Sequence, residues 1–389
     1  MKRRHFLILF ITVFIDYLSF GIIFPLLPFY IKSYDVSAFT VGAVIASFSL
    51  MQFLFSPLWG KLSDVVGRKP IILASLLGTS LSFIMLSFAS SIYAILVSRI
   101  LAGLFTSASL PTTYAYVADS TKQRERVEKF GMLGAAWGLG FVLGPALGGL
   151  LSTISPTTPF LVAGFIALVN FIFTIVFLPE SKTKSRKLEI KEDGSLFNVI
   201  QIVKHLNSKF GLLFIQIFIV SFALSSLETT FPFFVNYRLN VKEANVGYIF
   251  TFIGLSVAVT QGFLVGRIVK KYGERSTIII AQTLMVIAYL LIGFSPNILI
   301  LLLISAILSV GLALNEPTLA SLISRSSREG YGATMGVTWS FDSIARVGGP
   351  LLGGLLYAKF DYAIPFIVNS FLIGLSLFLF GCYLRSYEK

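Results

Sequence analysis

The sequence is poor in charged residues and in the side chains that hold metals or form disulfides. Only 13% of its 389 residues are charged, against about 25% in a typical soluble chain. A single cysteine, Cys382, excludes a disulfide framework, and two histidines leave too few ligands for haem or zinc. We therefore expect no metal and no cofactor. Since the chain also lacks a set of nucleophile, base and acid, we do not expect an enzyme.

Hydrophobic residues make up 56% of the chain before its 32 glycines are counted. A soluble fold of this size could not cover that much apolar surface, so we place the chain in a bilayer. A helix that crosses about 30 Å of hydrocarbon needs roughly 20 mostly apolar residues. Such runs lie at 6–31, 41–60, 70–89, 92–118, 129–152, 159–179, 210–236, 245–269, 275–294, 297–324, 331–358 and 362–384. We predict an all-α membrane protein with twelve transmembrane helices.

The basic residues indicate how these spans are oriented. If the N-terminus is cytoplasmic, 25 of the 31 Lys and Arg residues fall in cytoplasmic segments, which is a strong positive-inside signal. We predict a multi-pass protein of the plasma membrane with both termini cytoplasmic, acting as a monomer. Anionic lipid headgroups account for the net charge of +13. The expected partner is therefore the lipid bilayer, and no nucleic acid is needed.

The two halves of the chain repeat one another at an offset of 205 to 207 residues. The repeat aligns Phe24-Pro25 with Phe231-Pro232, Gly60 and Gly67 with Gly266 and Gly273, and Gly144-Pro145 with Gly349-Pro350. The polar stretch 180–209 separates the copies, so we predict an N-terminal half 1–179, a cytoplasmic linker and a C-terminal half 210–389. Two pseudo-symmetric six-helix bundles are typical of transporters, with a substrate site near the midplane and alternating access.

Several motifs carry a family resemblance. Residues 60–69 resemble the loop signature of the major facilitator superfamily, and the segments 99–150 and 178–180 are similar to its tetracycline-type drug:proton antiporters. The antiporter glycine motif consists of Gly140, Gly144, Pro145, Gly148 and Gly149. The resemblance implies the major facilitator fold and proton-coupled export of amphipathic small molecules.

The resemblance also implies a gating loop after the second span. Its residues are Gly60, Asp64, Gly67, Arg68, Lys69 and, at the end of span four, Asp119. In the resembled family such residues form a charge cluster that holds one access state. Lipid headgroups would explain the basic residues but not an acid between two glycines. Because Lys270 stands where Asp64 does in the second copy, we expect gating charges to be concentrated in the first loop.

Six ionisable residues lie within the spans, where a charge costs at least about 2.5–3.5 kcal/mol. They are Asp16, Arg99, Glu228, Glu316, Asp342 and Arg346. Asp342 and Arg346 are four residues apart on one helix, so they could form a structural salt bridge or a proton relay. We expect Asp16 to exchange a proton as its distance from Arg99 changes. Glu228 and Glu316 could bind a cation, carry a proton or stay neutral against a backbone carbonyl.

Aromatic residues are abundant, and apolar pockets with a few polar groups hold small ligands well. We expect Trp137 in span five and Trp339 in span eleven to line the substrate pocket. Alternative functions on the same fold stay open, because Asn and Gln side chains also occur in the spans. They are a proton symporter or facilitator for a polar nutrient or metabolite, and a lipid transporter.

Overall fold

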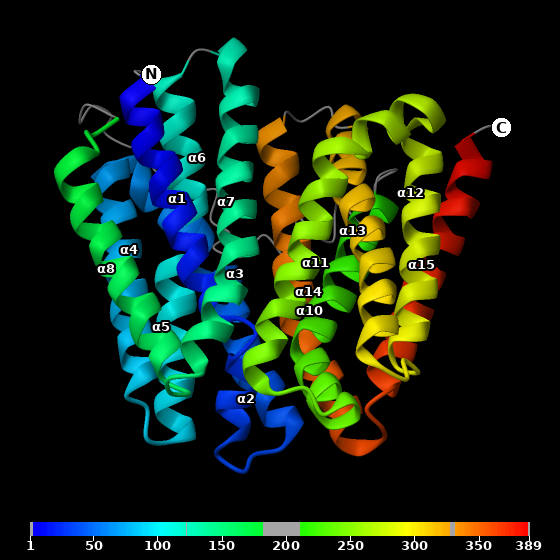
Figure 1. Ribbon diagram of the computed structural model, residues 1–389. Coiled ribbons are helices and arrows are strands. Elements are labelled where there is room, and N and C mark those ends of the chain that lie inside the picture. Colours follow the sequence, from blue (N-terminus) through cyan, green and yellow to red (C-terminus); the bar gives the residue numbers. More distant parts are fainter. Residues whose placement is uncertain (1–2, 122, 182–210, 327–330, 388–389) are drawn as a thin grey trace. The chain divides into compact units, whose positions relative to one another are not determined.

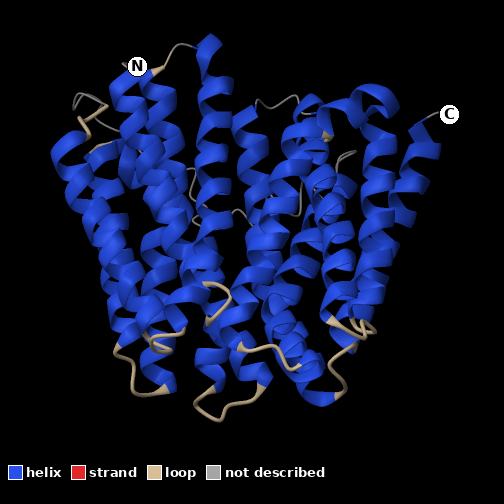
Figure 2. Cartoon of the chain, in the orientation of Figure 1, coloured by secondary structure: helices blue, strands red, loops and turns tan. Residues whose placement is uncertain are grey.

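The computed structural model describes residues 3–121, 123–181, 211–326 and 331–387 (Figure 1). All secondary structure in these ranges is helical (Figure 2). The helices are α1 (Arg3–Ile23), α2 (Leu27–Lys32), α3 (Ala38–Val66), α4 (Arg68–Ser87), α5 (Ile92–Thr106), α6 (Ser109–Ser120), α7 (Gln123–Ser152), α8 (Thr158–Phe177), α10 (Gly211–Leu239), α11 (Glu243–Phe263), α12 (Val265–Ile292), α13 (Ile298–Ser326), α14 (Tyr331–Lys359) and α15 (Ile364–Tyr387).

Eleven helical segments among the described residues are long and apolar enough to cross a membrane. One of them, Ile92–Ser120, consists of α5 and α6 together. The helix α14 is 29 residues long but is not among the eleven, and it carries the charged residues Asp342 and Arg346. The prediction of an all-α membrane protein is confirmed, while the count of twelve spans stays a prediction.

Two predicted spans are interrupted at prolines. The run 6–31 contains a turn around Pro25 that separates α1 from α2. The run 92–118 breaks at Ser107, four residues before Pro111, and this break separates α5 from α6. Proline lacks the N–H that would bond to the carbonyl four residues earlier, so the helix is weakened there. Hydropathy alone did not reveal either break, because both lie within apolar sequence.

The described chain divides into two compact units. Unit 1 comprises residues 1–34, 47–197 and 243–251, and unit 2 comprises 35–46, 198–242 and 252–389. Each unit thus contains a short segment from the sequence half that supplies most of the other. The predicted linker 180–209 lies outside the described residues except for its first two, so the predicted partition stays a prediction.

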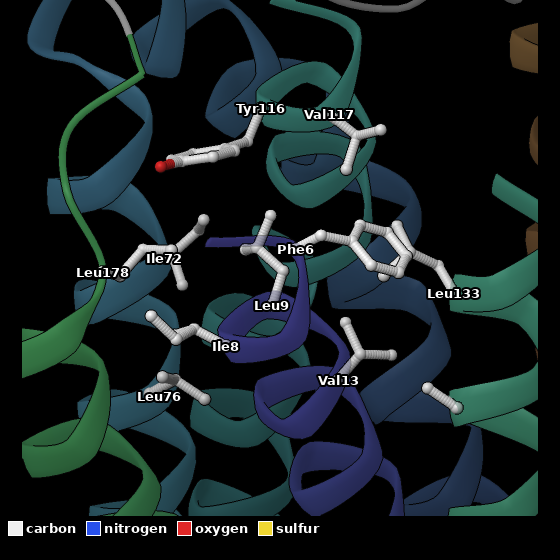
Figure 3. Packing of buried hydrophobic residues seen from close by; sticks show 11 residues of the cluster. Phe6, Ile8, Leu9, Val13, Ile72, Leu76, Tyr116, Val117, Leu133 and Leu178 are labelled. Carbon is white, nitrogen blue, oxygen red and sulfur yellow. The ribbon is translucent and has the colours of Figure 1, made fainter. Parts of the chain in front are cut away.

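Unit 1 has a hydrophobic core at the end of the helices where the N-terminus lies. Figure 3 shows side chains of α1, α4, α6 and α7 meeting there, with Leu9 among the residues from α1 and Leu178 following α8. The hydroxyl of Tyr116 donates to the Pro179 carbonyl at 2.7 Å. The core therefore fixes the segment after α8 against α4 and α6.

The helices α1 and α7 of unit 1 pack side by side (Figure 1), and glycines line their contact. A β-carbon at Gly144 would lie 2.6 Å from the Cα of Gly21, so only glycine permits this approach. In unit 2 the helices α10 and α14 pack in the corresponding way, and Gly349 of α14 meets the backbone of Phe222. The same pairing of helices therefore occurs once in each unit.

Candidate functional site

The loop between α3 and α4 turns at one residue, Gly67. Its φ of 113° and ψ of 161° belong to a region that side-chain-bearing residues rarely adopt. A β-carbon there would also lie 2.7 Å from Oε2 of Glu180. The resemblance placed both Gly67 and Gly60 in this loop. Only Gly67 adopts a backbone conformation that favours glycine, whereas Gly60 lies inside α3 with nothing within 4 Å of an added β-carbon.

The guanidinium of Arg68 is the centre of the predicted gating loop. Its Nη2 donates to Oδ1 of Asp64 at 2.7 Å, and its Nε donates to Oδ2 of Asp119 at 2.9 Å. Its Nη1 donates to the hydroxyl of Ser63. The side chain is only 7% exposed, so two carboxylates compensate a largely desolvated cation. The predicted grouping of Asp64, Arg68 and Asp119 is confirmed, and it ties together α3, α4 and α6.

The sequence did not reveal the part that Glu180 has in this loop. Its Oε1 accepts the backbone N–H of Arg68 at 3.0 Å, and its Oε2 accepts that of Lys69 at 3.1 Å. These N–H groups belong to the first turn of α4 and have no acceptor within the helix. The helix dipole also favours a carboxylate at this end. The Nζ of Lys69 in turn donates to the carbonyl of Ile175 on α8. The sequence shows an acidic residue directly after a predicted span. Nothing in that pattern indicated that its carboxylate would cap α4.

Asp16 does not form the predicted pair with Arg99. Its Oδ2 accepts a hydrogen bond from the hydroxyl of Ser109, the first residue of α6, at 2.6 Å. The guanidinium of Arg99 instead lies between two rings, 5.5 Å from the centroid of Phe48 and 5.6 Å from that of Phe83. Its Nε and Nη2 are buried without a hydrogen-bond partner. Arg99 lies on α5, whereas Ser109, the partner of Asp16, lies on α6. The break between these helices therefore separates Arg99 from Ser109.

Aromatic rings connect the surroundings of Asp16 with those of Arg99 within unit 1. Phe20 lies one turn after Asp16 on α1, and its ring centroid is 5.6 Å from that of Phe48. On the other side it approaches Phe141 of α7, at 6.2 Å. Trp137 packs edge-on against Tyr17 at 5.8 Å and remains 37% exposed. The predicted pocket residue Trp137 is thus part of an aromatic cluster beside Asp16, although its contact with a substrate stays a prediction.

Unit 2 holds a second charge cluster, built around Arg346 of α14. Its Nε lies 3.1 Å from Oδ2 of Asp342, so the predicted pair on one helix is confirmed. Its Nη1 lies 3.4 Å from Oε2 of Glu228 on α10. Ser221, also on α10, donates to Oδ1 of Asp342 at 2.6 Å. Two carboxylates thus share one guanidinium, which leaves the cluster with one excess negative charge when all three groups are ionised.

Glu316 and Trp339 also belong to unit 2. Glu316 is an exposed residue of α13. Trp339 is 42% exposed. It precedes Asp342 by three residues and Arg346 by seven, so the three share one face of α14. An aromatic ring therefore lies on the same helix face as the charge cluster.

The antiporter glycine motif on α7 faces two neighbours. Gly140, Gly144 and Gly148 meet the backbone of α1, whereas Gly149 meets the backbone of Ala244 at the start of α11. Pro145 lies inside the helix, and its carbonyl is approached by Gly247 of α11. The glycines of the motif therefore permit α1 and α11 to pack closely against α7.

Known transporters of one family resemble this chain over nearly its whole length. The family model described as "Major Facilitator Superfamily" matches residues 9–347 and also 213–389. "Multidrug resistance protein 2" of Bacillus subtilis is 29% identical over 97% of this chain and 94% of that protein. "Tetracycline resistance protein, class B" of Escherichia coli is 30% identical over 88% of this chain and 86% of that protein.

Solved structures show the same fold. The human organic anion transporter MFSD10 (TETRAN) superposes with a TM-score of 0.74 at 27% identity, covering 97% of this chain and 99% of that one. A bacterial homologue of the human lysosomal transporter Spinster, in an inward-facing conformation, has a TM-score of 0.79 at 14% identity. It covers 100% of this chain and 98% of its own. The chain belongs to the Major Facilitator Superfamily, and it is a membrane transporter of small molecules rather than an enzyme.

Proposed function

We propose that the protein exports amphipathic small molecules, cations among them, in exchange for protons. It does so by alternating access, as a monomer with twelve spans and both termini on the cytoplasmic side of the plasma membrane. The observation that carries this proposal is the cluster of Glu228, Asp342 and Arg346. The relatives named for multidrug and tetracycline resistance support it.

The excess negative charge of the cluster explains how protons and cations compete. Asp342 and Glu228 share the single guanidinium of Arg346, so one negative charge stays uncompensated in a low-dielectric setting. A proton on one carboxylate removes this charge, and so does a bound cation. Because either one satisfies the cluster, binding of one disfavours the other. Mutual exclusion of this kind is what an exchange of protons for cationic substrates requires.

Aromatic surface would supply the affinity for the apolar part of the substrate. Trp339 shares a helix face with Asp342, and Trp137 lies among rings of unit 1. An exposed indole can stack on a flat apolar body and attract a positive charge through its ring face. We assign Trp137 and Trp339 to the walls of the substrate pocket, and Asp16 to proton coupling in unit 1.

Four amide side chains of the spans hold helices together, which weighs against transport of a polar nutrient. Asn170 donates to the carbonyl of Thr12, and Asn369 donates to that of Ala223. Gln282 donates to Asn315. These four amides are buried and join one helix to another, so they are not available to line a polar pocket.

Purified protein in liposomes tests the proposal. With an imposed pH gradient, we expect the parent protein to drive fluorescent organic cations uphill, and Glu228→Gln to bind the same cations without uphill transport. Glu125→Gln, an exposed carboxylate of α7, is the matched control. Cation movement that is indifferent to the gradient in the parent would contradict proton coupling. Uphill transport by Glu228→Gln at the parental rate would exclude this cluster as the coupling site.

A further inference from the structure

The turn of the gating loop occurs a second time, in unit 2. Within α12 the backbone leaves the helical region at Gly273, with φ 78° and ψ 164°. The corresponding values at Gly67 are 113° and 161°. An offset of 206 residues aligns the two glycines. Both units therefore contain the same backbone turn between two of their helical segments.

The charges around the second turn are reversed. At the offset of 206, Asp64 aligns with Lys270 and Arg68 aligns with Glu274. The same offset aligns Asp119 with Arg325. Each charged position of the first cluster thus corresponds to a residue of opposite charge in the second copy. Opposite charges at these positions allow the same pairings as in the first cluster, with the polarity exchanged.

The contact made by Glu274 supports this interpretation. Its Oε1 accepts a hydrogen bond from the hydroxyl of Ser321 on α13 at 2.7 Å. The helix α13 corresponds to α5 and α6, because the offset aligns Pro111 with Pro317. In unit 1 the residue after the turn donates to α6, through Arg68. In unit 2 the residue after the turn accepts from α13.

We propose that Glu274 is a positioning residue that fastens the end of α13 to the second loop in one access state. It acts through Ser321, on the helix that also carries Glu316. Gating charges are then not concentrated in the first loop, as the sequence alone led us to expect, but present in both with opposite sign. This proposal rests on the alternating access proposed above.

Loss of the contact should expose α13 near its end. Thr318 lies three residues before Ser321 and is 2% exposed, so a cysteine there reports opening. In a Cys382→Ser, Thr318→Cys background, we expect Glu274→Ala and Ser321→Ala each to raise the rate of maleimide labelling about three- to tenfold. Glu274→Gln keeps an oxygen that accepts the Ser321 hydroxyl, so it should label more slowly than Glu274→Ala. The double variant Glu274→Ala, Ser321→Ala should label more slowly than the product of the two single effects, because the two substitutions share this hydrogen bond. Arg275→Gln, an exposed neighbour of Glu274, is the matched control and should leave the rate unchanged.

Labelling of Glu274→Ala at the parental rate, or full multiplication of the two single effects in the double variant, would overturn the proposal. Glu274→Gln should restore slow labelling, which an unspecific folding defect would not allow. If Glu274→Ala does not fold, the comparison of Ser321→Ala with Glu274→Gln decides. Failure of alternating access is a separate result. In that case, labelling at Thr318→Cys in the otherwise unchanged protein would not respond to substrate or to the pH gradient. The coupling between Glu274 and Ser321 would still be measurable.

Discussion

The carboxylate of Glu180 accepts the backbone N–H of Arg68 at 3.0 Å, across 112 positions of sequence. It therefore joins the segment after α8 to the turn that places the Arg68 side chain. Since the predicted linker begins at this residue, Glu180 connects the start of that linker to the predicted gating loop.

Replacing Glu180 should weaken this junction. Glu180→Ala leaves two N–H groups at the start of α4 without their acceptor, and we expect it to lower the free energy of unfolding by about 1–2 kcal/mol. Thermal unfolding of the purified protein measures the effect. Glu128→Gln, an exposed carboxylate of α7, is the control. Equal stability of Glu180→Ala and the parent would show that the cap is not needed.

Two glycines of the loop signature should respond in opposite ways to alanine. Gly67→Ala puts a β-carbon on a residue with a φ of 113° and against Glu180, and should cost about 1–2 kcal/mol. Gly60→Ala fills open space inside α3 and should be neutral or stabilising by up to about 1 kcal/mol. Thermal unfolding of both variants side by side decides. A large loss in Gly60→Ala would contradict the structure.

Asp64→Asn should impair transport while the protein stays folded. The Asp64 side chain is 45% exposed, so its ion pair with Arg68 contributes at most about 1 kcal/mol. That is little for stability but shifts two access states by up to about fivefold. Transport in liposomes, compared with thermal unfolding, separates the two effects. Parental transport with unchanged labelling of the loop would leave it only as a topology signal.

Removal of Arg99 should separate stability from function. The guanidinium lies between Phe48 and Phe83 with two unpaired nitrogens, so Arg99→Met exchanges a poorly compensated buried charge for an apolar chain of similar length. We expect Arg99→Met to unfold at the same or a higher temperature than the parent. If the charge is used in transport, the same variant loses activity. A strongly destabilised Arg99→Met would instead identify Arg99 as a structural residue.

The interface between α1 and α7 offers a further test. Gly144→Ala places its methyl group against the backbone of Gly21, which cannot yield like a side chain, and should cost about 1–3 kcal/mol. Gly138→Ala on the same helix meets nothing within 4 Å and serves as the control. We expect the order of thermal stability to be parent, Gly138→Ala, then Gly144→Ala by a clear margin. Similar stability for the two variants would contradict the close contact.

Without the family resemblance, the sequence could predict only contacts between residues that are close together in the chain. Asp342 and Arg346 were paired correctly because a helix brings residues four apart together. The family resemblance placed Asp119 beside Arg68. No comparable rule indicated that Glu228 would join Arg346 or that Glu180 would cap α4, since these contacts depend on how separate helices pack.

The position of Arg99 was mispredicted for a related reason. Hydropathy and charge suggested a carboxylate partner, yet aromatic rings took that place. A ring face attracts a cation without leaving any charge pattern in the sequence. The turn at Pro25 and the break before Pro111 were visible as prolines, but prolines are tolerated within membrane helices often enough that they did not decide the question.

The isolation of Arg99 also has an electrical consequence. A cation without a carboxylate partner retains its full charge, so the membrane voltage does work on it whenever α5 shifts along the membrane normal. That work is about 2.3 kcal/mol per 100 mV for a complete crossing, and about a tenth of it for a shift by a tenth of the membrane thickness. Arg346 is held by two carboxylates, so the voltage acts on the net charge of that cluster and not on Arg346 alone. A step that moves α5 therefore depends on voltage even when the transported molecule is neutral.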